Sequence, residues 1–185
     1  GWTVDLVLLN VKNDDRLFEV DKSVNIKILS VNDTRASFFQ LRKYLKVSRP
    51  NKVIGFNYPL VVMLVVVSKT LNFPISIWGR NNNTLSQLRY DFFKHPLKYF
   101  YQCIGDYFYQ KSDFIINQCL EMQEDFITVF PKMYKKNDVI YNPIDFNDLP
   151  QNSGMVKKDL LCVGRFVEQK SFHYAIMAFA KVSKF

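Results

Sequence analysis

Short apolar runs rich in β-branched residues alternate along this chain with segments of helix length, and this alternation constrains the fold more than any other feature. Six runs have the character of strands: residues 4–9, 25–30, 52–57, 74–79, 113–117 and 138–142. Helix-length segments lie at roughly 34–48, 59–71, 84–110 and 119–130. The strands are apolar on both faces, as in a parallel sheet covered by helices. The order strand, helix, strand, helix predicts a doubly wound α/β fold, although residues 59–67 would also suit a buried strand.

A change in composition at residues 143–157 divides the chain. This stretch holds two prolines, a glycine and several Asn and Asp residues, which is typical of a linker. We therefore expect an α/β domain at 1–142, a linker at 143–157 and the start of a second domain at 158–185. In the last part, an apolar strand at 160–163, which would bury Cys162, precedes a polar turn and a helix.

The charge of the chain favours anionic partners. It carries 25 Lys and Arg against 17 Asp and Glu, a formal net charge of +8. Such a field attracts phosphates, anionic lipid and nucleic acid alike, and an AT-rich genome would produce a similar composition. The apolar run at 59–67 is too short to cross a bilayer, which needs about 20 residues. The Cys and His residues lack zinc-site spacing, so we expect no metal centre.

The turn after the last predicted strand is a candidate phosphate site. Gly164 would let the backbone approach a ligand closely, and Ser171 is placed to cap the following helix. Arg165 and Lys170 could flank one anion above the free N–H groups of the helix start. The alternative is a strand-to-helix loop with two solvated cations. Neither a P-loop nor a dinucleotide fingerprint is present.

Four motifs resemble glycosyltransferase family 4. The segment "VGRFVEQKSFHYAIMAFAKV" is similar to the start of the family's second domain, and "SDFIINQCLEMQEDF" to a late strand and helix of the first. The sequence "VIYNPID", with Asn142 and Pro143, resembles the crossover between the two domains. The segment "PISIWGRNNNT" resembles a loop of polysaccharide-assembly members.

The resemblance implies the GT-B architecture, in which two Rossmann-like domains face a cleft. It implies sugar transfer with retention from a UDP- or GDP-sugar to a glycan or lipid-linked acceptor, without metal or other cofactor. Gly164, Arg165, Lys170 and Ser171 would hold the donor diphosphate. We expect a role in bacterial surface polysaccharide synthesis, in the cytoplasm or peripherally at the inner face of the cell membrane.

The sequence departs from the family pattern in several places. The family's Gly after the Lys is Ser171, and the Ser that commonly begins a helix of the first domain is Cys119. The family's acidic pair would lie beyond Phe185 and its glycine-rich first loop before Gly1. We therefore expect an internal fragment that is inactive alone, with catalytic residues that this sequence does not identify. An α/β protein without transferase activity is the alternative.

Three further stretches suggest contacts. Arg80, Asn81 and Asn82 follow a strand whose end should face the cleft, so they could bind an acceptor or form an ordinary polar turn. Residues 35–52 carry six cations and no acid behind an apolar stripe, which suits peripheral contact with an anionic membrane or a solvated helix face. Residues 89–111 are rich in aromatic residues and predict a buried or partner-covered helix that restarts at Pro96. A basic nucleic-acid-binding module stays a further alternative, but no recognition motif supports it and we expect no nucleic-acid partner.

Overall fold

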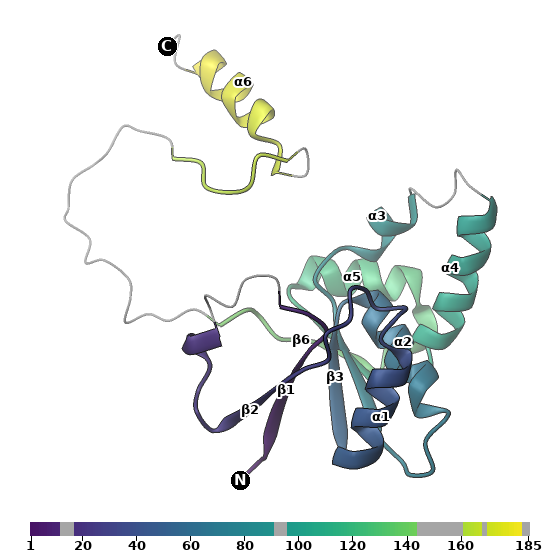
Figure 1. Ribbon diagram of the computed structural model, residues 1–185. Helices are drawn as coiled ribbons and strands as arrows, with labels where there is room; N and C mark the ends of the chain where they lie inside the picture. Colours follow the sequence, from purple (N-terminus) through teal and green to yellow (C-terminus); the bar gives the residue numbers. More distant parts are fainter. Residues whose placement is uncertain (12–16, 91–95, 144–160, 168–169, 183–185) are drawn as a thin grey trace. The chain divides into compact units, whose positions relative to one another are not determined.

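The computed structural model describes residues 1–11, 17–90, 96–143, 161–167 and 170–182 (Figure 1). The chain divides into two compact units, Gly1–Pro143 and Ile144–Phe185. All of the predicted linker at 143–157 except its first residue lies outside the described residues.

The strands of the first unit pair in parallel, as the sequence predicts. β1 (Val4–Leu8) pairs with β2 (Val24–Ile28), and the short helix η1 (Leu17–Glu19) lies between them in sequence. A second, four-stranded sheet consists of β3, β4, β5 and β6 in that order. Its strands are β3 (Lys52–Phe56), β4 (Ser76–Arg80), β5 (Phe114–Asn117) and β6 (Asn137–Val139). With the helices between them, they confirm the α/β fold class and are compatible with a Rossmann-like fold.

Helices occupy the segments between these strands. They are α1 (Phe38–Ser48), α2 (Tyr58–Ser68), α3 (Leu85–Tyr90), α4 (Pro96–Tyr109), α5 (Leu120–Val129) and the short η2 (Pro131–Met133). The ambiguous apolar run at 59–67 is thus helical. Asn57 caps α2 by accepting a hydrogen bond from the Leu60 N–H, and Pro59 suits the first turn of a helix. α1 and α2 lie side by side (Figure 1). The described part of α4 starts at Pro96, and because residues 91–95 lie outside the described residues, the restart of the helix at Pro96 stays a prediction.

The core lies on one face of the four-stranded sheet. Gly55, Gly79 and Ile115 are neighbours in register and point to the same side. A Cβ added at Gly55 would lie 3.0 Å from Leu64 Cδ1, and one added at Gly79 would lie 2.8 Å from Val61 Cγ2. α2 therefore packs directly on the backbone of β3 and β4. Strands in sequential order with right-handed crossovers place the connecting helices on one common side.

The opposite face of the sheet is more open. On β3, Ile54 is 41% and Phe56 is 53% exposed. On the neighbouring strands, the Trp78 and Phe114 rings lie 4.7 Å apart, and Lys52 Nζ lies 3.6 Å from the centroid of the Trp78 ring. Ile116, on the same face of β5, is only 5% exposed, so this face is exposed at β3 and buried at β5, and helical cover of both faces stays a prediction. An apolar pattern shows that a face avoids water, but it does not identify what covers it.

The described part of the second unit contains α6 (Phe172–Val182). The predicted strand at 160–163 is not formed where it can be checked: Leu161–Val163 have no strand structure and Cys162 is exposed, so the core role expected for that cysteine is wrong here. A parallel strand needs a neighbouring strand to satisfy its backbone, and the described residues offer none to this segment. Throughout the described ranges, no helix combines the length and the apolar character that a membrane span needs.

Candidate functional site

A pocket of about 750 Å³ opens at the carboxyl ends of β3 and β4. Its walls come from α2, α3 and α4, and its rim comes from the loops that follow β2, β3 and β4. Ligands of parallel α/β sheets bind at this edge, and the volume is in the usual range for a small-molecule site. Asn57, at the rim, has φ of 117°, a strained conformation for a residue with a side chain.

Arg80 is the last residue of β4, and the structure places it against the crossover rather than in the pocket lining. Its Nη2 donates to Asn142 Oδ1 at 2.8 Å and to the Ile140 carbonyl oxygen at 3.2 Å. A residue predicted for the acceptor cleft therefore meets a residue predicted for the crossover. That Arg80 contacts an acceptor stays a prediction.

Asn81 is buried inside the unit, with 3% of its surface exposed. Its Oδ1 accepts a hydrogen bond from the Tyr109 hydroxyl at 2.7 Å, and its Nδ2 donates to Asn117 Oδ1 at 2.9 Å. Tyr109 and Asn117 are themselves fully buried. Asn81 is part of the pocket lining, but its amide oxygen and its amide nitrogen are both already hydrogen-bonded. These two bonds connect the ends of β4 and β5 to α4.

Asn82 remains exposed at the pocket rim, and within the described ranges its side chain makes one hydrogen bond, to Gln118. Its Oδ1 accepts from Gln118 Nε2 at 3.0 Å, and Gln118 Oε1 accepts in turn from Asn142 Nδ2 at 3.4 Å. A chain of hydrogen bonds thus runs from the pocket rim through Gln118 to the crossover. Pro143 follows as the last described residue before the gap at 144–160.

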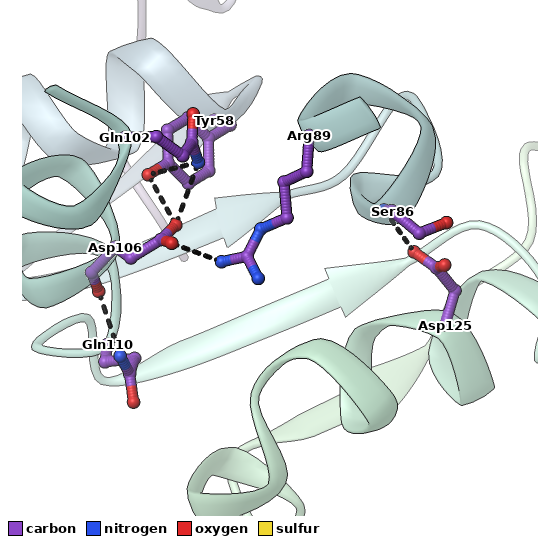
Figure 2. Close-up of polar contacts among 7 residues, drawn as sticks. All are labelled: Tyr58, Ser86, Arg89, Gln102, Asp106, Gln110 and Asp125. Atoms are coloured by element: carbon purple, nitrogen blue, oxygen red, sulfur yellow. Dashed lines mark hydrogen bonds and ion pairs between the residues drawn. The ribbon is translucent and has the colours of Figure 1, made fainter. Parts of the chain in front are cut away.

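Asp106 itself is not part of the pocket lining, but it is the centre of a polar cluster (Figure 2) that includes three lining residues, Tyr58, Arg89 and Gln102. The Asp106 carboxylate accepts hydrogen bonds from the Tyr58 hydroxyl at 2.8 Å and from Gln102 Nε2 at 2.9 Å, and it pairs with Arg89. Burial, together with the negative charge of Asp106, raises the pKa of the Tyr58 phenol above its usual value. Gly105 permits this contact, because a Cβ there would lie 2.6 Å from the Tyr58 hydroxyl.

The short helix α3 is held at both of its ends. At its start, Asp125 Oδ2 from α5 accepts hydrogen bonds from the backbone N–H groups of Leu85 at 2.7 Å and Ser86 at 3.2 Å (Figure 2). At its end, the Arg89 guanidinium reaches Asp106 and also lies 4.8 Å from the centroid of the Phe130 ring. These contacts fix α3 as a wall of the pocket.

Sequence reasoning missed the cluster around Asp106. Its members come from α2, α3 and α4, and no periodic pattern connects positions so far apart. One signal was available: Asp106 is an acid within an aromatic-rich helix, where an ionised side chain needs a partner.

The residues predicted to bind phosphate lie in the turn before α6. The Val167 N–H donates to the Arg165 carbonyl oxygen, and the Lys170 N–H donates to the Val167 carbonyl oxygen, both at 2.9 Å. A Cβ at Gly164 would lie 3.7 Å from Lys170 Cγ, so the turn folds back on itself. The side chains of Arg165 and Lys170 are both exposed.

Ser171 connects this turn to α6. Its carbonyl oxygen accepts hydrogen bonds from the N–H groups of Tyr174 and Ala175, which lie in the first turn of α6. Its φ is 52°, in the left-handed region that favours glycine. The position where the family resemblance places a glycine is therefore one where the backbone itself prefers one.

No group of three or more Cys, His, Asp or Glu side chains in the described residues is arranged to hold a metal ion. Comparison with known proteins found no family model that matches the chain and no matching curated protein.

Proposed function

We propose that this chain is part of a retaining glycosyltransferase that takes a nucleotide-sugar donor and a glycan or lipid-linked acceptor. The observation that carries the proposal is the turn of Gly164, Arg165 and Lys170 immediately before α6. The second support is the pocket at the carboxyl edge of the sheet in the first unit, where an acceptor would bind. The setting we propose is bacterial surface polysaccharide synthesis.

The chemistry required of the turn is neutralisation of charge. When the sugar leaves the donor, negative charge develops on the nucleotide diphosphate. The Arg165 guanidinium can bind two phosphate oxygens at once, and the Lys170 ammonium adds a compact positive charge. The N-terminal N–H groups of α6 carry further partial positive charge. Fixed groups of this kind stabilise a departing anion without reorganisation.

Binding of UDP and GDP to the full 185-residue chain, measured by isothermal titration calorimetry, tests the proposal. Arg165→Ala and Lys170→Ala should each weaken binding by about tenfold to a hundredfold, because each removes charged hydrogen bonds worth about 1.5–3 kcal/mol. Lys181→Ala is the matched control, since it removes a cation from the other end of α6. Equal losses in all three variants, or no detectable nucleotide binding by the unmodified chain, would contradict the proposal.

We include peripheral contact with an anionic membrane in the proposal, on the basis of two surfaces of the first unit. On α1, Leu41 and Leu45 are buried while Lys43 and Lys46 face solvent. On α4, large apolar side chains are exposed, among them Leu97, Phe100 and Tyr101. Solvent-facing cations and exposed aromatic residues are both features of surfaces that bind anionic lipid.

Co-sedimentation with vesicles tests this contact. Vesicles containing 30% phosphatidylglycerol should retain the chain at low salt and release it as salt rises, because each cation contributes about 1 kcal/mol that salt screens. The double variant Lys43→Gln, Lys46→Gln should bind these vesicles about thirtyfold more weakly at low salt, since two such contributions amount to about 2 kcal/mol. Equal binding to neutral phosphatidylcholine vesicles would exclude an electrostatic contact.

A further inference from the structure

We infer that the pocket between α2 and α4 binds a single-chain lipid that carries a phosphate head group. The inference rests on the proposed function and deepens it, because it selects the lipid-linked class from the two classes of acceptor. Three observations support it: the apolar walls of the pocket, an arginine at its rim without a carboxylate partner among the described residues, and the lack of any acid in its lining.

The walls come from a helix that is apolar all round. The sequence of α2, YPLVVMLVVVS, contains no charged residue. Val61, Leu64 and Val65 are buried in the core, while Val62, Met63 and Val66 remain half-buried and line the pocket. A helix of this kind requires apolar cover on its outer side as well.

The facing helix supplies part of that cover but leaves space. α4 packs against α2 and contributes Ile104 and Phe108 to the pocket lining. Ile104 is 41% exposed, so the space beside it is not filled by the protein. The apolar side chains of the two helices thus form walls suited to a hydrocarbon chain.

The rim of the pocket suits an anion. Among the lining residues, Arg35 and Arg89 are charged and none is acidic. Arg89 is already paired with Asp106. Arg35 is exposed, and among the described residues it has no hydrogen bond or ion pair. Asn82 and Asn83 line the same pocket as Arg35, and their side-chain amides can donate hydrogen bonds to phosphate or sugar oxygens.

Soluble probes distinguish the contribution of the alkyl chain of the ligand from that of its head group. We propose to titrate the full chain with hexyl, octyl and decyl phosphate below their micelle concentrations, and to follow the Met63 methyl signal by NMR. The dissociation constant should fall about threefold to fourfold for each added methylene, because each buries about 0.8 kcal/mol of apolar surface. Octyl glucoside should bind more weakly than octyl phosphate, and inorganic phosphate should leave the Met63 signal unchanged.

Substitutions in the protein test which residues bind the phosphate head group and which bind the alkyl chain. Arg35→Gln should weaken octyl phosphate binding about tenfold and leave octyl glucoside binding unchanged, whereas Lys69→Gln, which removes an exposed cation outside the pocket, should change neither. Ile104→Gln should weaken both ligands about fivefold, and Val47→Gln, at an exposed apolar position on α1, should weaken neither.

The inference is overturned if affinity does not depend on chain length, if Arg35→Gln and Lys69→Gln behave alike, or if Met63 does not respond to any alkyl phosphate. These outcomes are independent of nucleotide binding at Arg165 and Lys170. Loss of alkyl phosphate binding with nucleotide binding intact would refute only this inference. The reverse result would leave the lipid site standing and refute the proposed donor site.

Discussion

Replacing Asn81 by alanine should destabilise the first unit far more than replacing its neighbour Asn82. The Asn81 side chain makes two buried hydrogen bonds, to Tyr109 and Asn117, whose side chains are fully buried. Without the amide, a buried hydroxyl and a buried carbonyl both lose their partner. Each such group costs about 1–3 kcal/mol, so Asn81→Ala should lower the free energy of unfolding by about 2–5 kcal/mol.

Asn82→Ala is the matched control. Asn82 is the same residue type one position later, but it is exposed and loses only its bond to Gln118. Changes at such exposed positions stay within about 0.5 kcal/mol. The comparison therefore holds residue type and chain position constant and changes only burial.

Urea denaturation of the full chain, followed by circular dichroism, measures both variants. The urea concentration at the unfolding midpoint should fall sharply for Asn81→Ala, while the dependence of the unfolding free energy on urea concentration stays constant. In the Tyr109→Phe background, Asn81→Ala should lower the free energy of unfolding by at least about 1 kcal/mol less, because the hydroxyl that would lose its partner is absent. The reasoning is refuted if Asn81→Ala and Asn82→Ala are equally stable, or if the cost of Asn81→Ala is the same in both backgrounds.

Three further predictions concern the first unit. Gly79→Ala should destabilise it by about 1–3 kcal/mol in the same denaturation assay, because the new Cβ would lie within 2.8 Å of buried side chains; an unchanged midpoint would show that α2 can move away from β4. Cys119→Ser should stabilise it by about 0.5–1 kcal/mol, because Cys119 has the extended backbone of an N-cap but makes no side-chain cap bond; a loss of stability would contradict this assignment. The raised pKa of Tyr58 stabilises the fold fully below about pH 10, and this contribution is lost as pH rises from the ordinary tyrosine pKa toward the folded one. Tyr58→Phe should therefore reduce the fall in unfolding free energy above pH 10 by about 1.4 kcal/mol per pH unit, and an identical alkaline slope in the variant would count against it.

Local patterns determined the secondary structure of the first unit. The β-branched runs became β1 to β6 within a few residues, because apolar periodicity and strand propensity act over short distances. Pro59 acts in the same local way in the first turn of α2, where the N–H that proline lacks is not needed. The run at 59–67 was ambiguous in sequence. In the structure it is a helix that is capped by Asn57 and packs against β3 and β4.

The candidate site was only partly predictable. The sequence pointed to the end of β4, and a pocket is indeed found beside it. It could not tell that Asn81 is buried while Asn82 is exposed, because both follow the same strand in the same chemical context. It also grouped Arg80 with the acceptor cleft, whereas its hydrogen bonds reach Ile140 and Asn142, about sixty positions later.

What the sequence determined by itself is the kind and order of the elements, since each depends on residues close together in the chain. What only the tertiary structure decided is which side chains meet. The pair of Arg89 and Asp106, the hydrogen bonds of Asn81 to Tyr109 and Asn117, and the exposed apolar side chains of β3 all depend on which strand ends and helix faces become neighbours. Those contacts are chosen by packing and by the need to satisfy buried polar groups, and both act through space rather than along the chain.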